Sequence, residues 1–173
     1  MTKSEEIKTN LIYRGDCHSV LKREFPPECI DLIYLDPPFS FDPKYARLWY
    51  DKDTLKMFEE MRKGDVRHYV SWMSKRLEQC HRVLKNTGSI YLHCDWKFGH
   101  YLKMEMDNIF GRNNFQNEIV WYYRGGGASK KRFGRKHDTI FFYTKKTGDI
   151  HTFNLDDIRQ PYSEDSLERL KYK

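Results

Sequence analysis

Asp36 and the two prolines that follow it form the segment of this sequence best suited to chemistry. Residues 30–35 are mostly apolar and predict a short buried strand, and Asp36 leaves the C-terminal end of that strand. In open α/β sheets, ligands bind outside this end of the strands. Pro37 and Pro38 stiffen the chain, because each ring fixes its own φ and restricts the preceding residue. The segment can therefore hold the Asp36 carboxylate beside the Pro37 carbonyl, and both groups are hydrogen-bond acceptors.

Phe39 adds an aromatic face behind these two acceptors. Two acceptors beside a ring suit a planar group that carries an –NH2, and an exposed purine or pyrimidine base has this form. A rigid turn that only ends a strand remains the alternative. The apolar strand before an acid also suggests a nucleotide-hydrolysis site, but the chain has no GxxxxGK[ST] motif, which argues against that chemistry.

The elements around this segment alternate between strand and helix patterns, which predicts an α/β layered fold. Apolar residues at three- and four-residue steps predict an amphipathic helix over 68–85, ended by KNTG with Gly88 near its C-cap. Further elements follow in the order strand, helix, strand, strand and helix, at residues 88–95, 97–111, 117–123, 138–145 and 161–173. The two later strands are expected to pair antiparallel, and residues 150–153 are a candidate extension of the sheet.

Two further groups of side chains are placed by this arrangement. The segment LHCD ends the second strand on His93 and Asp95, which face the same crevice as Asp36 if the two strands are parallel. A structural pair and a substrate contact are both open for them. Trp121, Tyr122 and Tyr123 are expected in the core and the crevice wall.

The loop between the two later strands, residues 124–136, is rich in basic residues and contains no acidic one, in a chain of net charge +6. Such a loop can neutralise phosphates, with an affinity that falls as salt rises. The candidate phosphate contacts are Lys130, Lys131, Arg132, Arg135 and Lys136. A solvated hairpin loop is the alternative. The glycines of the loop do not suggest a cofactor cradle, because no helix pattern follows them.

Several classes of protein are excluded by composition. The polar N-terminus has no secretory h-region, and no run of 18 apolar residues predicts a membrane span. Cys17, Cys29, Cys80 and Cys94 form no CxxC pair and are predicted to be reduced thiols of a cytoplasmic protein. A zinc site from Cys80, His81, His93 and Cys94 has a spacing that fits no zinc module, so no metal is predicted.

Four segments resemble, in the same order, the amino-group DNA methyltransferases that act on N6 of adenine or N4 of cytosine. They are RGDCHSVLKREFPPECIDLIYLDPPFSFD, YVSWMSKRLEQCHRVLKNTGSIYLHCDW, HYLKMEMDNIFGRNNFQNEIVW and KHDTIFFYTK, and they cover about residues 11–155. The order matches the group in which the catalytic motif precedes the cofactor motif. The resemblance implies a partial Rossmann-like methyltransferase sheet with an antiparallel strand pair near the C-terminus.

The resemblance also implies a cofactor, a substrate and roles for individual residues. The cofactor is S-adenosylmethionine, the partner is DNA, and the target base is flipped out of the duplex. Asp36 and the Pro37 carbonyl orient the exocyclic amine, Pro38 completes the rigid turn, and Phe39 stacks on the base in place of the commoner tyrosine. Asp16, Leu35 and Asp36 line the cofactor pocket. An acid before the two prolines favours N6-adenine, and N4-cytosine is the alternative.

The sequence departs from the family at one motif, because no F-x-G-x-G cofactor turn is present. Residues 1–173 are therefore expected to be the N-terminal catalytic part of a methyltransferase domain, with 156–173 the truncated start of a target-recognition region. Alone, the chain is expected to bind S-adenosylmethionine weakly or not at all and to expose apolar surface. The alternative is a non-catalytic DNA-binding remnant or subunit, and a homodimer or a restriction subunit is a candidate partner.

Overall fold

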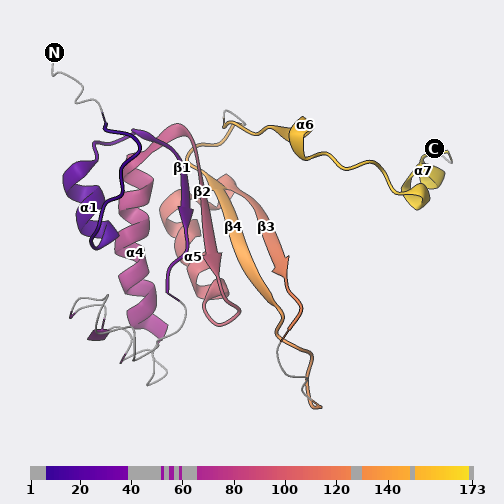
Figure 1. Ribbon diagram of the computed structural model, residues 1–173, viewed down its shortest axis with the longest axis horizontal. Coiled ribbons are helices and arrows are strands. Elements are labelled where there is room, and N and C mark those ends of the chain that lie inside the picture. The colour runs from indigo at the N-terminus through magenta and orange to yellow at the C-terminus, as the bar shows by residue number, and fades with distance from the viewer. Residues whose placement is uncertain are drawn as a thin grey trace.

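A four-stranded sheet of order β1-β2-β4-β3 organises the computed structural model, which describes residues 7–38, 52, 55, 56, 59, 66–125, 130–148 and 151–171. β1 and β2 are parallel, whereas β4 is antiparallel to both β2 and β3 (Figure 1). The strands are β1 (Ile30–Leu35), β2 (Leu84–Cys94), β3 (Phe115–Tyr122) and β4 (His137–Thr144). The predicted α/β fold with an antiparallel pair near its C-terminal side is confirmed.

The helices begin and end at residues with clear local roles. They are α1 (Cys17–Glu24), α4 (Val66–Val83), α5 (Gly99–Phe110), α6 (Leu155–Ile158) and α7 (Glu164–Leu170), with a 3₁₀ turn η1 (Arg112–Asn114). Asp16 caps α1, because its carboxylate accepts a hydrogen bond from the Ser19 N–H. Gly111 ends α5 with a φ of 87°, a conformation that favours glycine, as the sequence predicts.

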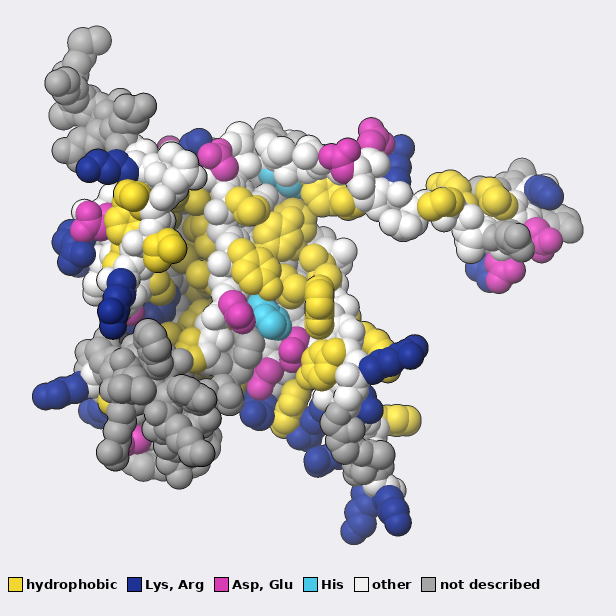
Figure 2. Space-filling model, viewed as in Figure 1, with side chains coloured by type: hydrophobic (Ala, Val, Ile, Leu, Met, Phe, Trp, Pro, Cys, Tyr) yellow, Lys and Arg dark blue, Asp and Glu magenta, His cyan; other side chains and the backbone are white. Residues whose placement is uncertain are grey.

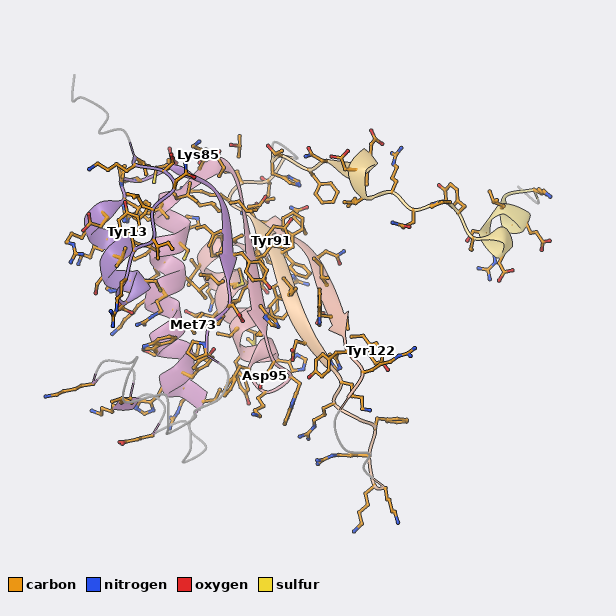
Figure 3. All side chains as sticks on the ribbon, in the orientation of Figure 1. Tyr13, Met73, Lys85, Tyr91, Asp95 and Tyr122 are labelled. Carbon is orange, nitrogen blue, oxygen red and sulfur yellow. The ribbon has the colours of Figure 1, made fainter. Side chains whose placement is uncertain are left out.

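α1, α4 and α5 lie on one side of the sheet, and the hydrophobic core fills the space between (Figure 1). The core face of α4 repeats at helical spacing through Tyr69, Met73, Leu77, Cys80 and Val83. The strands contribute alternate residues, among them Ile90, Leu92, Cys94, Phe141 and Tyr143. Figure 3 shows Met73 on α4, on this covered side of the molecule. Removing this apolar surface from water is the main stabilisation of the fold.

The opposite face of the sheet carries no helix among the described residues and presents hydrophobic side chains (Figure 2). Tyr91 stacks on Phe142, with ring centroids 4.6 Å apart and planes 6° apart. Tyr34 of β1 pairs with Tyr91 in the parallel ladder and is 55% exposed. The exposed apolar surface that the sequence predicts is therefore present on this open face, and Phe153 extends it by stacking on Phe142.

The expected burial of three aromatic residues in and after β3 is wrong. Trp121 and Tyr122 are 61% and 66% exposed, and Tyr123 is 38% exposed. Among the residues that the structure describes, β3 is the edge strand of the sheet and pairs only with β4, so no described strand lies along its other side. Figure 3 shows Tyr122 near the end of the strand pair, away from the helices.

The predicted C-cap at Gly88 is also wrong. α4 ends at Val83 and β2 begins at the next residue, so KNTG lies within the strand. β1 reaches the junction through Ile30, which pairs with Leu84, and the register then shifts before Leu32 pairs with Ser89. A Cβ at Gly88 would lie 2.7 Å from a Leu84 side-chain carbon, so glycine permits this close approach.

Residues 151–154 form no strand, contrary to the expected extension of the sheet. His151 and Phe153 instead place their rings against Phe142. The predicted final helix is present as α7, whose N-cap Ser163 accepts a hydrogen bond from the Ser166 N–H. α6 and α7 extend away from the sheet (Figure 1). Among the residues that the structure describes, no helix combines the length and hydrophobicity needed to cross a bilayer.

Candidate active site

Asp36 follows β1 directly and meets His93 of the neighbouring strand. Because β1 and β2 are parallel, their C-terminal ends lie at the same edge of the sheet. Oδ1 of Asp36 lies 3.0 Å from Nδ1 of His93. The Asp36 side chain is 65% exposed, whereas that of His93 is only 20% exposed. The sequence left the role of His93 open, and the structure places it in contact with the candidate catalytic acid.

Asp138 approaches the same histidine from the other side. Its Oδ2 lies 3.5 Å from Nε2 of His93, and its side chain is 22% exposed. In the antiparallel ladder His93 faces Ile140, and Asp138 lies two residues before Ile140 in β4, on the same face of the sheet. Figure 2 shows histidine and acidic side chains together on the open face, surrounded by hydrophobic side chains. Three strands therefore supply one polar cluster: Asp36, His93 and Asp138.

Asp95 has a structural role instead. Its Oδ1 accepts hydrogen bonds from the backbone N–H groups of Lys97 and Phe98, at 3.0 and 3.2 Å. Its backbone oxygen accepts from the Gly99 N–H, so Asp95 shapes the turn that leads into α5. Figure 3 shows Asp95 at the end of β2. Of the two residues that the sequence singled out here, His93 contacts Asp36 and Asp95 supports the loop.

The basic hairpin loop is tied to this end of the sheet through Trp96. The guanidinium carbon of Arg135 lies 3.5 Å from the Trp96 ring centroid, a cation–π contact. Trp96 comes three residues after His93, and the hairpin leads into Asp138. Lys130, Lys131, Arg132 and Arg135 are exposed and Lys136 is half-buried, so these side chains lie at the surface of the loop. Their contact with nucleic acid stays a prediction.

Asp16 anchors α1 to α4. Its carboxylate accepts hydrogen bonds from Ser19 and forms an ion pair with the buried Arg76 guanidinium. Burial alone would raise the pKa of Asp16, but the Ser19 N–H and the Arg76 charge outweigh it and lower that pKa. Leu35 packs against the hydrophobic core. Both residues thus have structural partners in this structure, and their place in a cofactor pocket stays a prediction.

The fit to S-adenosylmethionine rests on Asp36 rather than on these two residues. A sulfonium cation is stabilised by a nearby carboxylate, and Asp36 presents one at the open end of two parallel strands. Pro37 and Pro38 are half-buried, and the rigid turn expected of them stays a prediction. Phe39 lies outside the described residues. An acidic side chain at this place suits the charge of the cofactor, and the contact of Asp36 with S-adenosylmethionine stays a prediction.

Two other kinds of chemistry receive no support at this site. Cys80 and Cys94 are buried, and burial raises the pKa of each thiol to about 12. A thiol in this state is not a nucleophile at neutral pH, because the reactive form is the thiolate. The described residues contain no group of three or more His, Cys, Asp or Glu side chains that could hold a metal ion.

Sequence reasoning missed Asp138 and Trp96. The signal for Asp138 was the alternation of β4, which places Asp138, Ile140 and Phe142 on one face. That signal becomes useful only when the neighbour and register of β4 are known, because the partner His93 is 45 residues earlier. No local sequence pattern pointed to Trp96, because its contact with Arg135 depends on how the hairpin between β3 and β4 folds back towards the end of β2.

Comparison with known proteins gives a consistent set of relatives. A family model described as DNA methylase, N6_N4_Mtase, matches residues 30–172. The type II methyltransferase M.BglII of Bacillus subtilis is 32% identical over 163 residues, which cover 88% of this chain and 39% of that protein. The DNA adenine methyltransferase YhdJ of Escherichia coli (strain K12) is 30% identical over 154 residues, which cover 88% of this chain and 46% of that protein. The chain thus spans less than half the length of these two relatives.

Solved structures share the fold. The PvuII DNA methyltransferase, described as cytosine-N4-specific, has a TM-score of 0.55 at 19% identity and covers 78% of this chain and 48% of its own. The M1.HpyAVI–SAM complex has a TM-score of 0.50 at 15% identity and covers 87% of this chain and 60% of its own. At these identities the likeness establishes the fold alone.

Proposed function

The chain belongs to the N6_N4_Mtase family of DNA methylases, and from this premise we propose that it carries the catalytic part of an S-adenosylmethionine-dependent DNA N6-adenine methyltransferase. The observation that carries the proposal is the exposed Asp36 carboxylate at the end of β1, held by His93 at 3.0 Å. When bound, S-adenosylmethionine supplies an electrophilic methyl group. The residues of this chain have to orient and activate the amine that receives it.

Asp36 and the Pro37 carbonyl are the groups proposed to hold the amine. An exocyclic amine is a poor nucleophile because its lone pair is delocalised into the base. Two acceptors for its N–H bonds favour the pyramidal geometry, in which the lone pair is localised on nitrogen. Oδ1 of Asp36 faces His93, so Oδ2 is the atom left to accept from the amine and to take the proton that the methylated amine loses.

The hairpin loop is proposed to bind the DNA that delivers the base. A flipped base costs a few kcal/mol of lost stacking and pairing, which contacts to the phosphate backbone have to offset. Arg135 rests on Trp96 at the same end of the sheet as the polar cluster, so a backbone held by this loop passes close to Asp36. Phe39, directly after the turn, is proposed to stack on the base.

The choice of adenine, and of the biological setting, is part of the proposal. Asp36 before the prolines favours adenine, and the relative YhdJ is named an adenine methyltransferase. The name of M.BglII as a type II methyltransferase supports a restriction-modification setting, in which the protein acts on DNA in the cytoplasm. We place residues 156–173 at the start of a target-recognition region, because α6 and α7 project from the sheet and their described side chains are mostly exposed (Figure 1).

The proposal is tested by nucleoside mass spectrometry of unmethylated DNA after incubation with the chain and S-adenosylmethionine. Because the chain alone is expected to bind the cofactor weakly, S-adenosylmethionine is supplied in large excess. We then expect N6-methyladenine, and a rate at least about 100-fold lower for Asp36→Ala, because that variant lacks the group that orients the amine. Asp31→Ala is the matched control, since Asp31 lies at the other end of β1 and pairs with Lys85 on the surface. If N4-methylcytosine is found instead, the target base is cytosine. If the chain binds DNA but no methylated base is found, a non-catalytic DNA-binding unit is favoured.

A further inference from the structure

His93 lies between two carboxylates that come from different strands. Its Nδ1 is 3.0 Å from Oδ1 of Asp36, and its Nε2 is 3.5 Å from Oδ2 of Asp138. The first distance is that of a hydrogen bond, and the second is that of a close electrostatic contact. The histidine itself is mostly enclosed, while Asp36 is largely exposed. An enclosed side chain with a fixed ring thus contacts a carboxylate that solvent would otherwise leave free to rotate.

The proton on His93 is placed by the chemistry of its partner. An ionised carboxylate only accepts hydrogen bonds, so a contact at 3.0 Å requires that Nδ1 carries the hydrogen. Oδ2 of Asp138 lies 3.5 Å from Nε2, on the opposite side of the ring. This arrangement engages Oδ1 of Asp36, and Oδ2 is the second oxygen of the same carboxylate.

We propose that His93 is a positioning residue for Asp36, with Asp138 as the group that orients the histidine. The inference rests on the proposed function for its consequence, because a fixed Oδ2 matters only if that atom meets the amine. The structural part of the proposal is that Nδ1 of His93 carries a hydrogen directed at Asp36. This part can be tested whether or not the chain is active. A misplacement of about 1 Å at a reacting group lowers the rate roughly 100-fold. By holding Asp36 in place, His93 therefore affects the rate of methyl transfer without contacting the base.

The structural content is tested by two-dimensional NMR of the chain labelled with ¹⁵N in its histidine rings. His93→Asn assigns the signals among the 7 histidines. We expect Nδ1 of His93 to carry a proton in the unmodified chain, and Asp36→Ala to shift the ring towards the Nε2–H form. Asp31→Ala, at the other end of β1, leaves the signals unchanged. The proposal is overturned if Nδ1 carries no proton in the unmodified chain, or if the His93 signals do not change in Asp36→Ala.

The kinetic content is tested with two substitutions of similar size. The Nδ2–H of asparagine stands where the histidine Nδ1–H stands, whereas leucine fills the space without a donor. We expect His93→Leu to lower kcat about 10- to 100-fold with the KM for DNA unchanged, and His93→Asn to recover much of the rate. Equal loss in both variants, or a change confined to KM, contradicts positioning. If the unmodified chain methylates no DNA, the proposed function fails, and the NMR result still decides the assignment of His93.

Discussion

The two faces of the sheet differ in what they contain, although the same strands form both. On β2, Ile90, Leu92 and Cys94 are fully buried under the helices, while Tyr91 and His93 alternate with them on the open face. The covered face holds the apolar core, and the open face holds stacked rings and the cluster of Asp36, His93 and Asp138. Because side chains alternate along a strand, one segment can stabilise the fold and carry chemistry with little interference between the two.

The largest expected difference between the faces is in stability. Leu92→Ala removes a fully buried side chain from the core and is expected to cost about 2–5 kcal/mol of unfolding free energy. Tyr91→Ala, one residue away, removes the ring that stacks on Phe142 and is expected to cost about 0.5–1.5 kcal/mol. Urea denaturation of both variants measures the two losses. Equal losses of unfolding free energy in the two variants would mean that the open face is covered in solution and that the two faces do not differ in burial.

A smaller effect, dependent on pH, is expected where α5 joins β4 on the covered side. The Tyr143 hydroxyl donates to Oδ1 of Asp107 at 2.6 Å, and Lys103 pairs with the same carboxylate at 2.9 Å. Burial would raise the pKa of Asp107, but these two partners outweigh it and lower that pKa. A lowered native pKa stabilises the fold above the ordinary aspartate pKa of about 3.9, and this stabilisation is lost as pH falls through the native value.

We therefore expect Asp107→Asn to cost about 1–2 kcal/mol of unfolding free energy at pH 7. The difference from the unmodified chain shrinks as the pH is lowered below about 4, because the native carboxylate then loses its charge as well. Urea denaturation at pH 7 and pH 3 measures it. Asp157→Asn on α6, an exposed position, is the control and is expected to change little at either pH. A difference that is constant with pH would mean that the charge of Asp107 is not what holds α5.

The smallest expected effect concerns the loop beside the open face. Trp96→Leu removes the ring under Arg135 and is expected to raise the Kd for DNA about 2- to 5-fold, which corresponds to a cation–π contact of about 0.5–1 kcal/mol. Fluorescence anisotropy with a labelled duplex measures it. Arg135→Gln also lowers the slope of log Kd against log salt by about one if the guanidinium meets a phosphate.

Tyr13→Leu, at a tyrosine as exposed as Trp96 but packed on Phe25 beside α1, serves as the control for the DNA-binding measurement. Its affinity is expected to match that of the unmodified chain. A loss of affinity in Tyr13→Leu similar to that in Trp96→Leu would point to a general effect of removing surface aromatic groups.

Local patterns predicted most of the elements and the centre of the site. The period of α4, the glycine after α5 and the apolar run before Asp36 are short-range signals, and the structure has the helix, the helix end and the strand that they predict. The expected burial of that strand is wrong, because every residue of β1 is half-buried or exposed. The missed features depend on partners far along the chain. The burial expected for Trp121 failed because β3 is an edge strand, and the cap expected at Gly88 failed because β1 pairs with that segment. Asp138 joined the site only through the register between β2 and β4.

The direct passage from α4 into β2 determines where this chain can tolerate an insertion. Val83 and Leu84 are both fully buried, and the Val83 carbonyl accepts a hydrogen bond from the Cys29 N–H at 2.8 Å. The junction therefore cannot accommodate an additional residue without moving its neighbours. One added residue there would turn Tyr91 and His93 into the core and Leu92 out to solvent. The hairpin between β3 and β4, whose described residues are mostly exposed, can lengthen without moving any strand. Variation in length is therefore expected to accumulate in the hairpin, while the helix–strand junction keeps a constant length.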